Sequence, residues 1–255
     1  MIAVSLQSGS NGNCLYVEAE GVKLLFDAGI SGRQAEKRLA DLGRDIREVD
    51  ALIISHDHAD HLRCAGVLHR KYGLSLYMTR QTLEAGKTQK LGRLATVRFF
   101  QAGASIDFGS VSVKTIPTPH DGADGVAFVV EARGRRLGIL TDLGHLFAGL
   151  AETIGTLDAV FLESNFDPEL LDRGLYPDFL KRRIRGPGGH LSNGEAAGLL
   201  QTAAPDRLQW ACLAHLSEQN NDPDLARETH RRKLADRFPL HVAGRYGASE
   251  VLKVD

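Results

Sequence analysis

The sequence predicts one α/β domain. Short apolar runs typical of strands alternate with segments of helical pattern in both halves of the chain. No linker, low-complexity tract or convincing repeat of about 20–50 residues divides the 255 residues. Because 43% of the residues are apolar and 25% are charged, the chain can bury a sizeable core. We therefore expect residues 1–255 to form a single domain.

The first half of the chain is expected to consist mainly of strands. Runs rich in β-branched or aromatic residues predict strands at Ile2–Leu6, Cys14–Glu18, Val22–Phe26, Ala51–Ile54, Leu74–Met78 and Thr96–Phe100. Asn11-Gly12 is typical of a hairpin between the first two strands. Ser31 can cap a helix that continues to about Leu42 and stops at Gly43.

The second half adds both strands and helices. Strands are predicted at Ser110–Ile116, Val126–Val130, Leu137–Thr141, Ala159–Glu163, Leu208–Leu213 and Glu250–Val254. Helices are predicted at Tyr176–Arg185, Ser192–Ala203 and Asp224–Ala235. Ser192 and Glu195 have the spacing of a capping box, which places a helix start at Ser192.

Charge and cysteine content exclude several classes of protein. The formal net charge is −1, so no whole-molecule field favours nucleic acid or a membrane. The three cysteines are widely spaced and form no CxxC motif, which disfavours a disulfide scaffold or a zinc ribbon. No apolar run approaches the roughly 18 residues that span a bilayer, and the first residues lack the pattern of a signal peptide. We expect a cytoplasmic protein that does not bind membranes.

A dense histidine motif follows the predicted strand Ala51–Ile54. His56, His58, Asp60 and His61 form the pattern HxHxDH, with Asp57 between the first two histidines. Neutral imidazole is the commonest metal ligand in proteins, and carboxylates are the next hard donors. The end of a strand places side chains in a crevice where ligands commonly bind. This spacing suits two adjacent metal ions better than one.

Three more ligand candidates lie downstream, each after an apolar run. They are His120, Asp142 and His215. Each taken singly is more often a structural residue. Taken together, they supply the ligands that a two-metal site would otherwise lack.

The ordered set of HxHxDH, His, Asp and His resembles the metallo-β-lactamase superfamily. The resemblance covers the chain from the first hairpin to His215. It implies an αββα sandwich, in which two mixed β-sheets are flanked by helices. It also implies that one zinc or manganese ion is bound by His56, His58 and His120, and a second by Asp60, His61 and His215, with Asp142 bridging the two.

The expected chemistry is hydrolysis. Two divalent ions about 3.5–4 Å apart hold a hydroxide and stabilise both the attacking and the leaving oxygen of a displacement. Asp60 can ligate a metal and also orient or deprotonate the water. Asp57 is either an acceptor for an imidazole N–H or a simple cap.

The substrate is indicated by a closer resemblance. Ser8–Asn13, Glu163–Asn165, Gly189–Asn193 and His215–Asn221 are similar to the YycJ/WalJ-like group, compact bacterial proteins regarded as DNA exonucleases. His190 precedes a predicted helix start, where an anion is favoured. We expect His190, Ser192 and Asn193 to contact a scissile phosphate, with His190 helping to protonate the leaving oxygen. This histidine also resembles the phosphate-binding histidine of the β-CASP nucleases, although the chain has no room for their inserted domain.

Several residues keep an alternative interpretation. His190 could be a capping or surface histidine, and Glu163 could orient His190 or a ligand, or form a structural salt bridge. The basic runs Lys181–Arg185 and Arg227–Arg237 could contact a phosphate backbone or be solvated helix faces. The sequence therefore favours a dinuclear-metal hydrolase of nucleic acid, a DNA exonuclease above all. The alternative is a small-molecule hydrolase of an ester, lactone, thioester or cyclic phosphodiester.

Overall fold

The computed structural model describes residues 1–255 and contains two seven-stranded sheets. Each sheet is mixed, with an antiparallel part that passes into a parallel part. In spatial order, the first sheet contains β14 (Leu252–Lys253), β1 (Ile2–Gln7), β2 (Cys14–Ala19), β3 (Val22–Phe26), β4 (Ala51–Ile53), β5 (Ser75–Met78) and β6 (Val97–Phe99). The second contains β13 (Leu240–Val242), β12 (Trp210–Ala214), β11 (Ala159–Glu163), β10 (Arg135–Leu140), β9 (Val126–Ala132), β8 (Val111–Pro117) and β7 (Ser105–Phe108).

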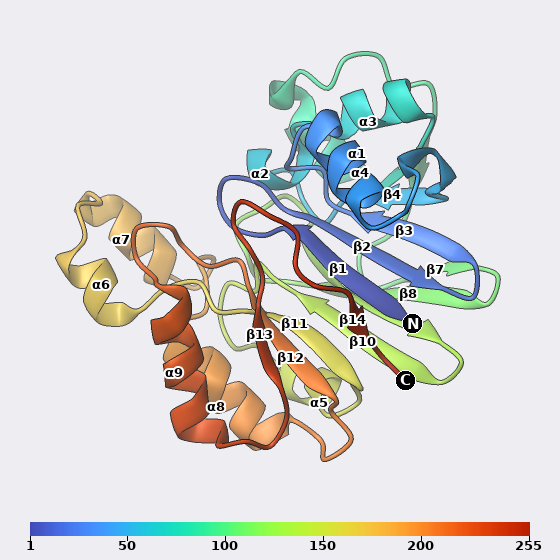
Figure 1. Ribbon diagram of the computed structural model, residues 1–255. Helices are drawn as coiled ribbons and strands as arrows, with labels where there is room; N and C mark the ends of the chain where they lie inside the picture. Colours follow the sequence, from blue (N-terminus) through green and yellow to red (C-terminus); the bar gives the residue numbers. More distant parts are fainter.

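Helices cover the outer faces of the two sheets (Figure 1). They are α1 (Gly32–Asp41), α2 (Ala59–Leu62), α3 (Ala65–Tyr72), α4 (Arg80–Ala85), α5 (Leu150–Ile154), α6 (Pro168–Arg173), α7 (Asp178–Arg185), α8 (Asn193–Ala203) and α9 (Pro223–Leu234), with 3₁₀ turns at Ile46–Glu48 and Gly86–Gln89. The expected sandwich of two mixed sheets flanked by helices is confirmed. No helix combines the length and the apolarity needed to cross a bilayer.

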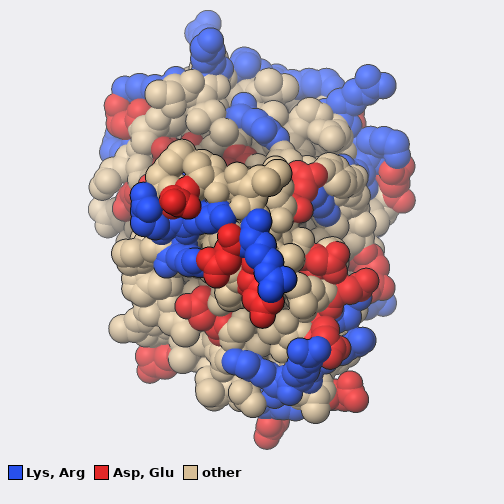
Figure 2. All heavy atoms as spheres, turned by 90° about the vertical axis from the view of Figure 1, so that its left-hand side faces the viewer, with Lys and Arg blue, Asp and Glu red and all other residues tan.

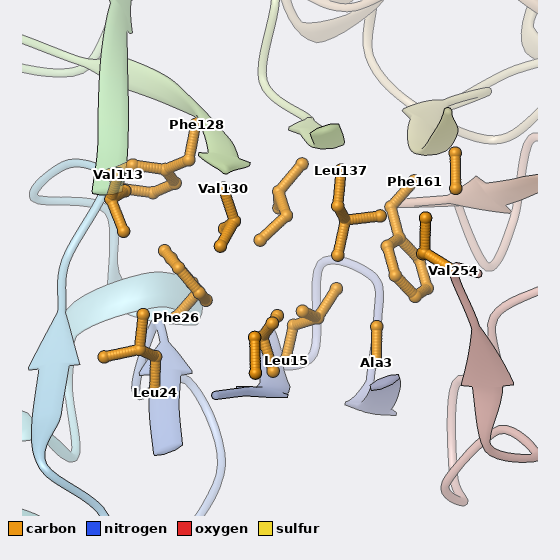
Figure 3. Packing of buried hydrophobic residues seen from close by; sticks show 14 of the residues in the cluster. Ala3, Leu15, Leu24, Phe26, Val113, Phe128, Val130, Leu137, Phe161 and Val254 are labelled. Carbon is orange, nitrogen blue, oxygen red and sulfur yellow. The ribbon is translucent and has the colours of Figure 1, made fainter. Parts of the chain in front are cut away.

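The core lies in three apolar layers. One fills the space between the sheets, where the rings of Phe26 and Phe128 are 5.0 Å apart between centroids (Figure 3). A second lies between the first sheet and the helices α1 and α3, and a third between the second sheet and the helices α5 and α8. Strands β4, β11 and β12 are buried along their whole length, which explains why their sequences are continuous apolar runs.

Every strand and helix expected from the sequence is present, and its ends differ by at most two residues. Both predicted helix starts have a complete capping box, at Ser31 with Gln34 and at Ser192 with Glu195. Helices α2 to α6 and strands β7 and β13 lie where no element was expected. Helices this short are marginal in isolation and depend on tertiary packing. In α3, for example, Tyr72 is buried and its hydroxyl donates to Gly32 O over 3.0 Å.

The parallel parts of the two sheets place five strand ends in one region. Strands β3 and β4 of the first sheet and β10, β11 and β12 of the second end there. Three residues just after these ends have positive φ: Asp27 (65°), Asp142 (56°) and His215 (55°). Non-glycine residues in this region are uncommon, and aspartate tolerates it better than most. The backbone therefore turns sharply at the points where polar side chains leave the sheets.

A buried histidine on α9 makes the stability of the fold depend on pH. His230 is fully buried, its Nδ1 pairs with Ala226 O at 2.9 Å, and its Nε2 has no hydrogen-bond partner. Burial, with a smaller contribution from Lys233, lowers its pKa to about 4. An unfolded histidine has a pKa of about 6.5, so between pH 6.5 and 4 the unfolded chain binds a proton that the folded chain does not. We expect this residue to cost about 3 kcal/mol of unfolding free energy as the pH falls through that window.

Urea unfolding of the wild type and of His230→Leu at pH 7.5 and pH 4 tests this expectation. Both proteins contain the same other titrating groups, so the difference between their pH-dependent losses isolates His230. The loss should be smaller in the variant by about 3 kcal/mol. Equal losses in the two proteins would contradict the assignment.

Candidate metal centre

The structure brings together the side chains of all seven residues that the sequence predicts as metal ligands. They come from four connections between strands. The connection after β4, which includes α2, supplies His56, His58, Asp60 and His61. The connections after β8, β10 and β12 supply His120, Asp142 and His215. Ligand atoms of His56, His58 and His120 lie within 4.8 Å of one another, and so do those of Asp60, His61 and His215. These are the two triads that the resemblance implies.

Asp142 lies between the two triads. Its Oδ2 is 3.3 Å from His61 Nε2, and its Oδ1 is 3.5 Å from His215 Nε2 and 3.7 Å from His120 Nε2. One carboxylate thus faces histidines of both triads. This is the position that a bridging ligand requires.

Each of the histidines in the first triad has one ring nitrogen held by the protein. His56 Nδ1 pairs with Ser55 Oγ at 2.9 Å, and His120 Nδ1 with Gly189 O at 2.8 Å. His58 is reversed, because its Nε2 is 3.3 Å from Asp121 Oδ1 while its Nδ1 is 3.2 Å from His120 Nε2. A partner on one ring nitrogen fixes the orientation of the ring and leaves the other nitrogen for a metal.

The same arrangement holds in the second triad. His61 Nδ1 is 2.7 Å from Asp27 Oδ2, and His215 Nδ1 is 3.5 Å from Glu163 Oε1. The Nε2 atoms of both histidines point at Asp60 Oδ2, at 3.6 Å and 3.4 Å. The ligand set is therefore oriented by a surrounding shell, as is usual for metal-binding histidines.

Two buried atoms at the centre of the cluster lack a hydrogen-bond partner. They are His56 Nε2 and Asp142 Oδ2. A buried polar atom without a partner costs free energy, so native proteins leave few of them. A divalent ion would satisfy both atoms. The residues present therefore fit a divalent metal ion.

The charges of the cluster also favour a cation. Burial would raise the pKa of Asp60, but His61 and His215 hold it below its ordinary value. Burial opposes the charge on His61, but Asp142, Asp27 and Asp60 outweigh it and raise its pKa to about 9. Burial lowers the pKa of His56 well below its ordinary value, and its four imidazole neighbours add to this effect. The carboxylates thus stabilise positive charge in the cluster, and a metal ion can supply that charge in place of protons.

His190 and Glu163 lie beside the cluster as a hydrogen-bonded pair. His190 Nδ1 is 2.7 Å from Glu163 Oε1. Glu163 is fully buried, and its Oε2 accepts the backbone N–H groups of Leu143 and Leu191. Both carboxylate oxygens are therefore engaged, and Glu163 orients His190 as one of the two interpretations of the sequence expects. Glu163 also forms a further group of possible metal ligands with Asp142, His190 and His215.

The side chains of three more predicted residues are engaged within the protein. Asp57 Oδ1 accepts the backbone N–H of Ala123 at 2.7 Å, which agrees with the second of its two interpretations, a cap. Ser192 Oγ is used in the capping box of α8. Asn193 is fully buried, and its Oδ1 accepts from Ser164 Oγ at 2.6 Å and from Asn221. We therefore assign Ser192 and Asn193 to the support of the α8 start, because their side chains are not free to bind a substrate.

Most of the predicted basic runs are engaged within the protein. On α7, Arg185 pairs with Asp172 at 2.6 Å and Lys181 donates to Asp172 O. On α9, Arg227 and Arg232 pair with acidic residues of the same helix. Figure 2 shows basic and acidic side chains interspersed over this face of the molecule, with no continuous positive band. The alternative of solvated helix faces thus describes these runs better than a preformed phosphate track.

Arg183 is also paired within the protein, but its partner Asp121 connects it to the metal cluster. Its Nε and Nη2 donate to Asp121 Oδ2 and Oδ1 at 2.5 and 2.9 Å, and Asp121 faces His58. The sequence analysis missed both Asp121 and Asp27. The position of Asp121 directly after His120 could have indicated it, and Asp27 follows an apolar strand as Asp142 does.

Removal of the carboxylate next to His58 is expected to weaken metal binding. In Asp121→Asn, the negative charge is lost and the one remaining oxygen cannot replace both carboxylate oxygens, which serve Arg183 and His58; such outer partners are worth about 10- to 100-fold in metal affinity. Competition against a chromophoric chelator measures the dissociation constant directly. Asp172→Asn is the matched control, because Asp172 also pairs with an arginine of α7 but does not touch the cluster. Equal metal affinity in Asp121→Asn and the wild type would contradict the positioning role.

Comparisons with known proteins agree with this geometry. Residues 8–145 match the family described as the Metallo-beta-lactamase superfamily. The chain belongs to this superfamily. It is 35% identical over 233 residues to "Exodeoxyribonuclease WalJ" of Streptococcus pneumoniae serotype 2 (strain D39), which covers 90% of this chain and 87% of that protein.

Two further proteins are similar to this chain. The chain is 36% identical over 224 residues to "Exodeoxyribonuclease YycJ" of Bacillus anthracis, which covers 87% of this chain and 84% of that protein. Among solved structures, the metallo-beta-lactamase fold protein YhfI from Bacillus subtilis has a TM-score of 0.74 at 18% identity. That match covers 98% of this chain and all of the other. The superfamily and its fold are thus established for this chain, and its histidine and aspartate clusters fit divalent metal ions.

Proposed function

We propose that this protein is a metal-dependent exonuclease that hydrolyses the phosphodiester bonds of DNA. The observation that carries the proposal is the cluster of five histidines and two aspartates, in which a protein partner fixes every imidazole. The relatives at 35% and 36% identity, both named exodeoxyribonucleases, support the choice of substrate and reaction. The three cysteines are free, which supports a reducing, cytoplasmic location.

The proposed ligand set binds two ions, zinc or manganese. His56, His58 and His120 would hold one ion, and Asp60, His61 and His215 the other. Asp142, which lies between the triads, would be available to both. When bound, two such ions activate a water and stabilise charge on the reacting phosphate.

The remaining roles fall to residues of the chain. Asp60 is the more exposed of the two proposed carboxylate ligands, at 20% side-chain exposure against 5% for Asp142, and it lines the pocket that opens onto the ligands. It is therefore placed to orient the attacking water and to accept its proton. His190 lines the same pocket and is held by Glu163, so it is placed to protonate the leaving oxygen.

One observation favours the alternative of a small-molecule hydrolase. The single cationic side chain that lines the pocket is Arg183, which is paired with Asp121. A nucleic-acid groove ordinarily presents free cations to the phosphates. An ester, thioester or cyclic phosphodiester would not need them.

A nuclease assay separates the two candidates. End-labelled single- and double-stranded DNA and RNA are incubated with zinc, manganese or a chelator, and with Asp60→Ala in parallel as the control for contaminating nuclease. Stepwise, metal-dependent shortening of DNA that disappears in Asp60→Ala is the expected result. A protein that contains metal but leaves every nucleic acid intact would overturn the proposal in favour of the small-molecule hydrolase, which a screen of esters, thioesters and cyclic phosphodiesters would then identify.

A further inference from the structure

The pocket over the metal ligands is also lined by three apolar side chains. It has a volume of about 200 Å³, and its apolar wall is formed by Tyr176, Leu180 and Ile184. Tyr176 lies between α6 and α7, and the other two lie on α7. Figure 1 shows these two helices projecting from one end of the sandwich. The pocket therefore has a charged face that suits a phosphate and an apolar face that the proposed hydrolysis leaves without a role.

The wall is fixed in position by contacts on both sides. Ile184 is buried with Phe166 and Leu171, and Tyr176 and Leu180 pack against this small core. The Arg183–Asp121 pair ties α7 to the loop after β8, and His190 N donates to Ile184 O at 2.9 Å. A wall anchored in this way can present a preformed surface to a ligand.

The volume limits what can occupy the pocket. Pockets that enclose a drug-sized ligand are about 300–1,000 Å³. At about 200 Å³ this pocket lies below that range, which favours a single nucleotide unit over a longer stretch of strand.

We propose that this pocket binds the terminal nucleotide of a DNA strand, with its base on the ring of Tyr176 and its phosphodiester at the metal ligands. The proposal rests on the proposed function and deepens it, because it accounts for removal of nucleotides from an end. Tyr176 is half-buried, so one part of its ring is fixed by the small core and the rest is open to the pocket. Aromatic side chains stack on every base, so this contact binds nucleotides without reading sequence.

Two other exposed apolar residues of this segment lie outside the pocket lining. Leu175 is 97% exposed and Phe179 is 66% exposed. Phe179 is an aromatic residue on α7, and Tyr176 is an aromatic residue just before this helix. Unlike Tyr176, Phe179 does not line the pocket. It is therefore the matched control for Tyr176.

The test combines variants of the protein with a missing base in the substrate. Labelled single-stranded oligonucleotides carry either a normal nucleotide or an abasic residue at the end from which the wild type removes nucleotides. A third oligonucleotide carries the abasic residue several positions inward. Initial rates of release of the terminal unit give kcat/KM for each pair, and thermal unfolding with metal content confirms that each variant is folded and loaded.

The expected results follow from the stacking contact. For the wild type, loss of the terminal base lowers kcat/KM by about tenfold or more, whereas the inward abasic residue leaves it unchanged. Tyr176→Ala and Tyr176→Leu, the second of which keeps the apolar packing, lower kcat/KM on the normal substrate by a similar factor and no longer distinguish the two ends. Tyr176→Phe keeps the distinction, and Phe179→Ala behaves as the wild type.

Each contrary outcome identifies what fails. If Tyr176→Ala and Tyr176→Leu distinguish the normal end from the abasic end as strongly as the wild type, the base does not lie on Tyr176 and this inference is overturned, while the proposed function stands. If Phe179→Ala loses the distinction instead, the base lies outside the pocket. If the wild type removes no nucleotides from any oligonucleotide, the proposed function is overturned and this inference with it.

Discussion

Asp142→Asn is expected to lower DNA hydrolysis by at least about a thousandfold, which corresponds to about 4 kcal/mol of transition-state stabilisation. Asp142 is the one carboxylate that faces histidines of both triads, at 3.3 Å from His61 of one and 3.7 Å from His120 of the other. An asparagine has the same shape but no charge, so the bridging position loses the anion that holds two cations together. Metal content should fall with activity, because both ions depend on this side chain.

Asparagine is chosen because it removes the charge of Asp142 without disturbing the backbone. Asp142 has a φ of 56°, a conformation that asparagine tolerates and alanine does not. Asp124 supplies a control with the same substitution in the same backbone region, since its φ is 55° and it belongs to none of the ligand groups. Asp124→Asn should keep activity within about twofold and metal content unchanged.

Steady-state rates and metal analysis of the two variants check this prediction together. The bridging role is contradicted if Asp142→Asn retains both ions and more than a tenth of the activity. A loss of activity in Asp124→Asn as large as that in Asp142→Asn would show that the substitution acts through the backbone.

The ligands could be predicted from the sequence because they are encoded locally. His56, His58, Asp60 and His61 lie within six residues after an apolar strand, and His120, Asp142 and His215 each follow another one. Parallel strands align their carboxyl ends, so strand order alone converts this pattern into a spatial cluster. The same reasoning predicts the long central strands, whose burial on both faces leaves continuous apolar runs.

Which supporting residue holds which ligand could mostly not be predicted, because the partners come from distant segments. Asp27 supports His61 across 34 positions, and Gly189 supports His120 across 69. Asp57 lies next to two ligands in sequence but points at the backbone of Ala123, so proximity along the chain was misleading. The short helices could not be predicted for the same reason, because they depend on distant contacts. Helix α3, for example, is stabilised by the burial of Leu68 and Tyr72 more than by its own helix propensity.

His190→Ala is expected to lower the rate of DNA hydrolysis by about 10²- to 10⁴-fold, the range for loss of a general acid. His190 Nδ1 is committed to Glu163 at 2.7 Å, which leaves Nε2 as the nitrogen that can carry a proton to the substrate. The ring lies beside the cluster, with its centroid 5.1 Å from that of His215 and 4.9 Å from that of His120. Metal content should be unchanged, because His190 belongs to neither of the proposed triads.

The leaving group distinguishes general acid catalysis from a structural role. A nucleotide p-nitrophenyl ester releases a stable phenolate that needs no proton, so His190→Ala should hydrolyse it within about tenfold of the wild-type rate. Equal losses on DNA and on the p-nitrophenyl ester would instead mean that His190 supports the metal site or the start of α8, and the source of the leaving-group proton would then have to be water.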